Sequence, residues 1–112
     1  MKSSDFIHGS DVAWEAAGER VARQIMGYDE RLMMVKVAFE QGSTGEVHTH
    51  PHSQASYIAE GKFEVTLGER TMALAEGDGF YVEPGLPHGV KCLEKGLIID
   101  MFSPAREDFL KQ

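Results

Sequence analysis

The sequence predicts an all-β protein, a closed barrel or sandwich of short strands with one short helix at its C-terminal end. Glycine recurs at intervals of roughly ten residues, as expected where turns separate short strands. Runs rich in apolar and β-branched residues lie between the glycines. The expected strands are residues 20–26, 31–40, 46–50, 55–60, 62–67, 70–76, 80–83, 88–94 and 97–103. So many strands favour a closed sheet, because open edges invite aggregation.

Turn signals and one helical signal complete this prediction. Gly68 and Glu69 separate two strand patterns and are expected to form a two-residue hairpin. Only the tail looks helical. Ser103 is expected to cap a helix, Pro104 to occupy its first position, and residues 105–112 to complete about two turns.

Composition and charge limit the class of protein. A chain of 112 residues and 12.4 kDa is expected to form one domain over residues 1–112, with its barrel core at about 31–103. The net charge of −7, without a basic run, argues against nucleic acid and anionic membrane surfaces as partners. Cys92 is the sole cysteine and cannot form an internal disulfide. Because no apolar leader or span of transmembrane length is present, we expect a cytoplasmic location.

Three of the five histidines fall within the five residues "HTHPH". His48 and His50 are expected to share one face of a strand, since strand side chains alternate, and such a pair can present two imidazoles to one metal ion. Pro51 cannot donate to a ladder and is expected to bend the chain. His52 therefore need not share that face, and we expect it to be exposed rather than to support its neighbours.

Two further residues can complete a metal site. Gln54 returns to the even-numbered register and offers a carbonyl oxygen, and His88 follows the rigid turn "EPGLPH" on another strand. The alternative is a group of surface histidines in a loop, unrelated to metal. The glycine that follows Gln54 at seven residues and the distant "PGLPH" favour the metal site.

This arrangement resembles the cupin family. The family's first motif, G-x5-H-x-H-x3-4-E-x6-G, aligns with residues 42–61, and its second, G-x5-P-x-G-x2-H-x3-N, aligns with residues 77–92. Three positions depart from the motifs, because Gln54 replaces a glutamate, Glu83 a proline and Cys92 an asparagine. The resemblance implies a double-stranded β-helix, the jelly-roll barrel of single-domain cupins.

Gln54 narrows the chemistry expected of such a metal site. A neutral amide in place of a carboxylate leaves a divalent ion with its full charge, which makes the ion a stronger electrophile toward an anionic substrate. A Lewis-acid role is therefore favoured over redox chemistry. The identity of the ion stays open among Ni, Zn, Mn and Fe.

Asp100 interrupts an otherwise apolar strand, on the face that it shares with Ile98 and Phe102. A buried, unpaired carboxylate is costly, so it is expected to be paired, protonated or placed in a polar cavity. The alternative is a structural salt bridge or a strand at the edge of a sheet. Arg106 follows six residues later, and it would bind an anion at a barrel mouth or be solvated on a surface.

Three long segments resemble the family of the pectin-degradation protein KdgF, between about Trp14 and Leu110: "LMMVKVAFEQGSTGEVHTHPHSQASYIAEGKFEV", "GDGFYVEPGLPHGV" and "IIDMFSPAREDFL". Members of this family convert 4,5-unsaturated monouronates, released from pectin or alginate by lyases, into linear ketonised sugars. The resemblance implies one divalent ion on His48, His50, Gln54 and His88. It further implies catalysis by Asp100 and Arg106, with Gln54, Phe102 and Arg106 contacting the substrate.

Two other classes of cupin remain open. A non-catalytic cupin that binds sugar or metal would keep the ligands without needing Asp100, whereas a metal-dependent dioxygenase would consume oxygen. The preference between pectin- and alginate-derived sugars also stays open. We further expect a homodimer, since a small open-mouthed barrel with many apolar strand positions usually covers a sheet face or edge by pairing.

Overall fold

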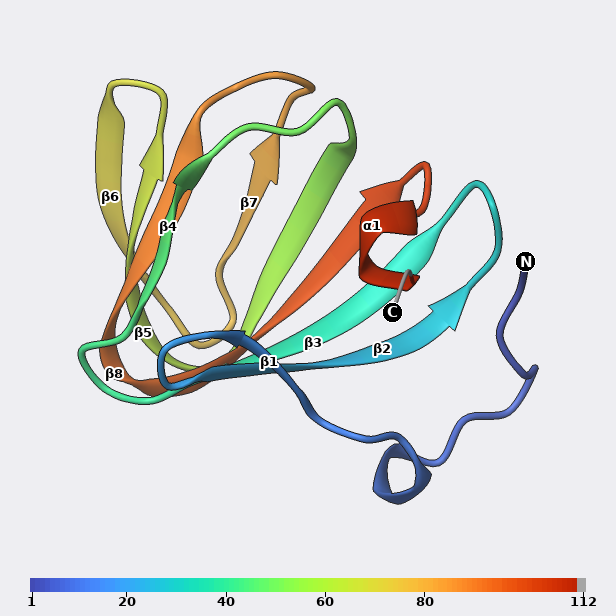
Figure 1. The fold of residues 1–112 in the computed structure, drawn as a ribbon. Helices are drawn as coiled ribbons and strands as arrows, with labels where there is room; N and C mark the ends of the chain where they lie inside the picture. Colours follow the sequence, from blue (N-terminus) through green and yellow to red (C-terminus); the bar gives the residue numbers. More distant parts are fainter. Residues whose placement is uncertain (111–112) are drawn as a thin grey trace.

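A strongly curved eight-stranded sheet makes up most of the structure, which is a computed structural model that describes residues 1–110 (Figure 1). The strands are β1 (Glu15–Gly18), β2 (Val21–Tyr28), β3 (Met33–Phe39), β4 (Thr44–His48), β5 (Ser53–Leu67), β6 (Arg70–Ala75), β7 (Gly79–Val82) and β8 (His88–Ser103). A 3-10 helix, η1 (Gly9–Asp11), precedes β1, and the helix α1 (Glu107–Leu110) follows β8. The all-β fold predicted from the sequence is confirmed.

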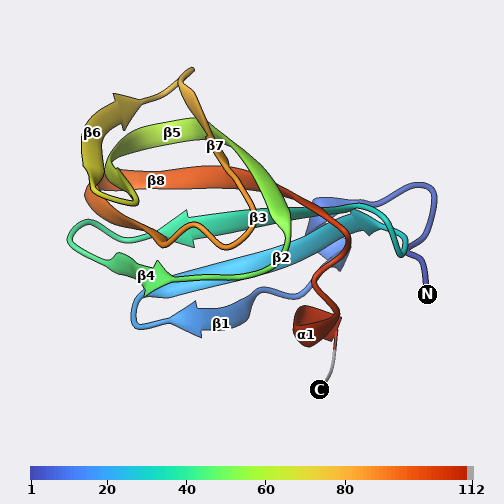
Figure 2. The ribbon, with the colours of Figure 1, turned by 90° about the horizontal axis from the view of Figure 1, so that it is seen from above.

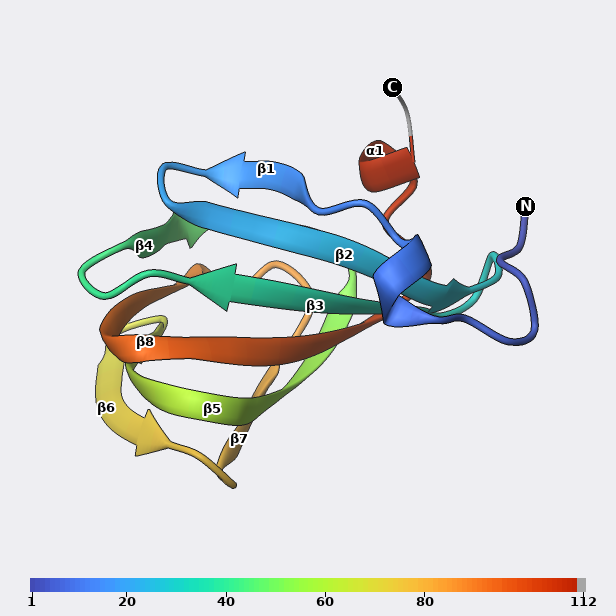
Figure 3. The same cartoon turned by 90° about the horizontal axis from the view of Figure 1, so that it is seen from below.

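The two longest strands, β5 and β8, organise the sheet. They pair antiparallel from Ser53 with Ser103 to Leu67 with His88. The path of paired strands is β1-β2-β3-β8-β5-β6, which Figure 3 shows in succession. On its other edge β8 pairs first with β4 and then with β3, and β5 pairs first with β7 and then with β6 (Figure 2). Because each long strand serves two neighbours on one edge, the sheet curls around a shared interior.

Glycines allow β5 and β8 to bend where they lie against each other. A Cβ atom on Gly61 would lie 2.5 Å from the carbonyl oxygen of Lys95, and one on Gly96 would overlap the carbonyl oxygen of Glu60. The register between the strands also shifts here, between Ile58 and Phe63. Backbones that approach this closely leave no room for a side chain, so glycine is required at the bend.

The expected strand boundaries need three corrections. The predicted strands 55–60 and 62–67 form the continuous β5, and 88–94 and 97–103 form the continuous β8, because the glycines bend these strands without ending them. The predicted strand 46–50 ends at His48. The short edge strand β1 was not expected from the sequence. The predicted hairpin is confirmed, since Leu67 pairs with Arg70 across Gly68 and Glu69.

The C-terminal helix is shorter than expected and begins later. Ser103 does not cap it, because Ser103 is the last residue of β8, pairs with Ser53, and donates from Oγ to the carbonyl oxygen of Arg31 at 2.8 Å. Within the described chain α1 covers Glu107–Leu110, and residues 111–112 of the expected helix lie outside the described residues. No helix within residues 1–110 has the length and hydropathy needed to cross a membrane.

The interior holds two groups of buried apolar side chains. The larger group contains Val21, Phe39, Ile58, Phe63, Val65, Cys92 and Ile98. The smaller group contains Met33, Val35, Phe102 and Ala105. Asp100 lies on β8 between Ile98 of the larger group and Phe102 of the smaller one, as strand alternation predicts. The fold therefore places this carboxylate on the inner face of the barrel.

The close approach at the bend predicts that Gly96→Ala lowers the free energy of unfolding by roughly 1–3 kcal/mol, since the added methyl group forces the two backbones apart. Urea denaturation measures the change. Gly9→Ala is the matched control, because a Cβ at Gly9 meets no atom within 4 Å, and its stability should match wild type. Equal stabilities for the two variants would contradict this explanation of the bend.

Candidate metal centre and cavity

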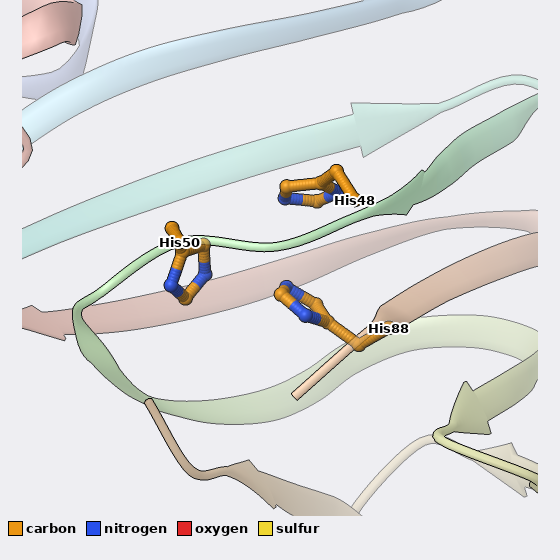
Figure 4. A group of neighbouring side chains, drawn as sticks. All are labelled: His48, His50 and His88. Atoms are coloured by element: carbon orange, nitrogen blue, oxygen red, sulfur yellow. The ribbon is translucent and has the colours of Figure 1, made fainter. Parts of the chain in front are cut away.

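Three histidine side chains point toward one another between β4 and β8 (Figure 4). His48 ends β4, His50 follows in the next loop, and His88 begins β8, where it pairs with His48. One nitrogen from each ring lies within 4.8 Å of the others. Gly89 makes the approach possible, because a Cβ there would lie 2.9 Å from the carbonyl oxygen of Gly45 on β4. This group of three histidines could hold a metal ion.

Backbone carbonyls orient all three rings. The Nδ1 atoms lie 2.8 Å from the oxygen of Glu46 for His48, 3.1 Å from that of His52 for His50, and 2.8 Å from that of Leu86 for His88. A carbonyl oxygen only accepts, so Nδ1 is the donor on each ring and Nε2 is the nitrogen that can offer a lone pair to a metal ion. Metal-ligating histidines are oriented in the same way. Within residues 1–110 the buried Nε2 of His88 has no hydrogen-bond partner.

Gln54 adds an oxygen to this group of nitrogens. Its buried side chain donates from Nε2 to Ser56 Oγ at 2.9 Å, which turns Oε1 toward His50 Nε2 at 2.8 Å. Both facing atoms are acceptors, and two acceptors this close repel unless a cation or proton lies between them. Three imidazole nitrogens and one amide oxygen are donors that suit a divalent transition-metal ion, and coordination by all four residues stays a prediction.

Asp100 lies beside the histidines through the pairing of β8 with β5. Asp100 faces Ser56 across the strands, and Ser56 Oγ donates to Asp100 Oδ1 at 2.6 Å. Gln54 Nε2 lies 3.4 Å from the same oxygen. A row of hydrogen bonds thus runs from Gln54 through Ser56 to Asp100. It connects the candidate metal ligand with the carboxylate.

The environment of Asp100 disfavours its charged form. Loss of solvent raises the pKa of Asp100 to about 6, against the opposing effects of the Ser56 hydrogen bond, the Arg106 and His48 charges and the Gln54 hydrogen bond. Asp100 forms no salt bridge within residues 1–110, and β8 lies between β3 and β5. The two structural alternatives, a salt bridge and an edge strand, are therefore wrong.

A cavity of about 280 Å³ brings most of the expected site residues together. Its lining includes His48, Gln54, His88, Asp100, Phe102 and Arg106. Apolar side chains from both core groups form much of the remaining wall. A cavity with an apolar wall and a few convergent polar groups is the usual form of a small-molecule site.

Arg106 lies at this cavity and not on an open surface. Its side chain is 11% exposed, and its guanidinium lies over the rings of Phe102 and Phe109, with Cζ 5.0 Å and 4.1 Å from their centroids. Nε and Nη2 donate to the two carboxylate oxygens of Asp108 at 3.0 Å and 2.9 Å. Asp108 therefore fixes the orientation of Arg106 through the edge formed by Nε and Nη2, and the terminal edge of the guanidinium takes part in no hydrogen bond within residues 1–110.

His52 was expected to be exposed, and this expectation is wrong. The ring is half-buried, with its centroid 5.4 Å from that of His50 and 6.3 Å from that of Phe102. Burial, followed by the Arg106 charge, lowers the pKa of His52. Because its backbone carbonyl also orients His50, His52 supports the neighbouring site residues.

Three residues at the site were missed by the sequence analysis: Ser56, Arg23 and Phe109. Ser56 shares a strand face with Gln54, and Arg23 shares one with Val21 and Ile25. Strand periodicity could therefore have identified both residues. The position of Phe109 depends on how the C-terminal segment folds back, which no local pattern indicates.

The curled sheet and its histidine group define the class of protein. They are those of a cupin, and the family description "Cupin domain" matches residues 35–101. The chain is 40% identical over 102 residues to the pectin degradation protein KdgF of Dickeya dadantii, covering 89% of this chain and 93% of that protein. The chain belongs to the cupin family and, within it, to the KdgF family.

Solved structures show the same relationship. A cupin described as RmlC-like, from Shewanella frigidimarina, superposes with a TM-score of 0.94 at 44% identity, over 96% of this chain and 97% of that one. KdgF from Halomonas sp. superposes with a TM-score of 0.90 at 34% identity, over 96% of this chain and 99% of that one. The similarity therefore extends over nearly the full length of each chain.

The donor set predicts one divalent ion per chain in wild-type protein and its loss from the double variant His48→Ala/His50→Ala, since two of the three histidines that could hold the ion are removed. Elemental analysis measures the metal, and circular dichroism checks that the fold is kept. His8→Ala is the matched control, because His8 is exposed and lies outside the histidine group, and it should retain the ion. A metal content in the double variant equal to that of wild type would refute the proposed metal site.

Proposed function

We propose that this protein converts 4,5-unsaturated monouronates into linear ketonised uronates by ring opening and tautomerisation. The substrates would be released from pectin or alginate by lyases. Membership of the KdgF family supports a role in pectin degradation. The observation that carries the proposal is the position of Asp100, whose carboxyl group lines the same cavity as His48 and His88 and is hydrogen-bonded through Ser56 to Gln54.

The proposed reaction is an isomerisation, and its atoms balance without an added reactant. The substrate is a cyclic hemiacetal with a double bond between C4 and C5 and a carboxylate on C5. Loss of the proton from the C1 hydroxyl breaks the bond between C1 and the ring oxygen, which gives an aldehyde at C1 and an enol at C5. A proton added at C4, with loss of the enol proton, gives the ketone at C5. No group is oxidised or reduced overall.

Asp100 is the proposed general acid and base. A carboxyl group held by Ser56 in a cavity with little solvent can accept one proton and deliver it to C4, provided that the sugar is oriented above it. Phe102, on the same face of β8, would present a flat apolar surface to the sugar ring. Gln54 would contact the substrate beside the ligand histidines.

Arg106 is the proposed partner of the substrate carboxylate. Asp108 accepts from Nε and from one N–H of Nη2, so Nη1 and the second N–H of Nη2 are left to meet an anion in the cavity. A divalent ion, when held by His48, His50, Gln54 and His88, supplies Lewis acidity to a bound carboxylate or ring oxygen.

Asp100→Asn tests this proposal against a structural role. Turnover of lyase-generated unsaturated uronate, followed by the loss of its ultraviolet absorbance, is expected to fall on the order of a hundred- to ten-thousandfold, since an amide cannot exchange a proton. Metal content should equal wild type. The melting temperature should hold or rise, because a neutral amide replaces a carboxylate with little solvent.

The same assay separates the rival classes of function. A destabilised Asp100→Asn protein that still turns over uronate at nearly the wild-type rate would refute the catalytic assignment. Wild-type protein that binds metal but never accelerates loss of the uronate would indicate a non-catalytic binding cupin. Oxygen uptake in step with substrate loss, measured with an oxygen electrode, would indicate a dioxygenase.

We also propose that two copies of the chain form a homodimer through the outer face of the sheet. Met34, Tyr57 and Tyr81 are large exposed side chains on this face, and strand pairing brings Met34 next to Met101 and Tyr57 next to Ile99. An exposed apolar sheet face of this kind is usually covered by another protein surface, and here we propose a second copy of the chain. Light scattering should therefore give twice the chain mass of 12.4 kDa, and a monomer mass at working concentration would refute the dimer.

A further inference from the structure

Arg23 is a second arginine in the wall of the cavity. On β2 it lies two residues from both Val21 and Ile25 and therefore shares their face of the strand. Because those two side chains pack in the two buried groups, the Arg23 side chain is also directed to the inner face of the sheet. It is 21% exposed and lines the same cavity as His48 and Asp100. A guanidinium directed inward among apolar side chains loses solvent, and this cost needs polar partners to offset it.

Contacts fix the guanidinium of Arg23 but leave one edge available. Nε donates to Glu15 Oε1 at 2.7 Å, and Cζ lies 3.8 Å from the centroid of the Phe109 ring. Within residues 1–110 the two terminal nitrogens of Arg23 take part in no hydrogen bond. Arg23 therefore offers the paired terminal donors that bind a carboxylate in bidentate form.

Arg106 lies on the same aromatic ring and, like Arg23, donates to a carboxylate. Its Cζ is 4.1 Å from the centroid of Phe109, and Asp108 accepts from its Nε and Nη2. Phe109 thus lies against two guanidinium groups at one cavity, and within residues 1–110 the terminal pair of donors on each guanidinium, Nη1–H and one Nη2–H, takes part in no hydrogen bond. An anionic ligand in the cavity would therefore find an open pair of donors on Arg23 as well as on Arg106.

We infer that Arg23 binds the carboxylate of the sugar together with Arg106 and sets the preference for anionic over neutral sugars. The inference rests on the proposed function for the class of substrate, since a uronate brings one carboxylate into the cavity. The competing explanation is structural: Arg23 would tie β1 to the C-terminal helix through Glu15 and Phe109 and never touch a ligand.

Calorimetric titration with D-galacturonate and with its methyl ester tests the inference, because esterification removes the negative charge of the carboxylate and leaves the sugar ring and its hydroxyl groups unchanged. Arg23→Met keeps an unbranched side chain against Phe109 and removes the donors. Its affinity for galacturonate should fall about ten- to hundredfold, the loss expected for a charge-assisted hydrogen bond, while its affinity for the ester stays within about twofold of wild type. With unsaturated uronate the same variant should show a raised KM and a kcat near wild type.

Glu15→Gln is the matched control, since it removes the carboxylate charge beside Arg23 and keeps both the guanidinium and a side-chain oxygen that can accept from Nε; it should bind galacturonate as wild type does. If Arg23→Met lowers the melting temperature, Arg23→Lys is used in its place. The single ammonium group of Arg23→Lys lacks the paired donors and should also bind galacturonate more weakly than wild type. Equal losses for acid and ester, or an equal loss in Glu15→Gln, would establish the structural explanation and overturn the inference.

The outcome also separates this inference from the proposed function. Wild-type protein that binds galacturonate through Arg23 but does not consume unsaturated uronate would refute the proposed reaction and leave the anion site intact. Wild-type protein that binds neither galacturonate nor its ester would overturn the anion site itself.

Discussion

The site depends on one row of hydrogen bonds that crosses from β5 to β8. Gln54 donates to Ser56, and Ser56 donates to Asp100. Because the Ser56 hydroxyl proton is donated to Asp100, Ser56 Oγ can only accept from Gln54. The Gln54 amide therefore turns its nitrogen toward Ser56 and its oxygen toward His50. The same row holds the Asp100 carboxyl in the cavity. Loss of the Ser56 hydroxyl would disturb the ligand geometry and the carboxylate together, because both are oriented by that single group.

The long antiparallel pair β5 and β8 brings this row and the histidines to one place. The pairing sets Ser56 opposite Asp100 and Gln54 opposite Phe102, and the first part of β8 pairs with β4 to set His88 opposite His48. One strand thus carries a candidate metal ligand, His88, at its start and the Asp100 carboxylate near its end. The strand can serve both positions because glycines let it bend without ending. The chemistry of the cavity and the curvature of the sheet therefore have a common cause.

Local sequence patterns predicted the features that depend on alternation and turn chemistry. The all-β class, the hairpin at Gly68 and the inward direction of Asp100 follow from periods of two and from glycine positions. The continuity of the long strands could not be predicted, because a glycine that bends a strand and one that ends it look alike in sequence. The burial of His52 depends on packing between segments distant in sequence. Arg23 was missed although it obeys the same alternation as Asp100, since a basic residue in a strand is usually solvated.

Stereochemistry at C4 tests most directly whether the carboxylate on β8 delivers the proton. Conversion of the unsaturated uronate in D2O places one deuterium at C4, and nuclear magnetic resonance of the early product distinguishes the two possible positions. A proton from Asp100 reaches only one face of a bound sugar, so the protein should give a single deuterated stereoisomer, whereas the reaction without protein should give both. The same mixture of stereoisomers with and without protein, at an accelerated rate, would contradict delivery by a fixed group in the cavity.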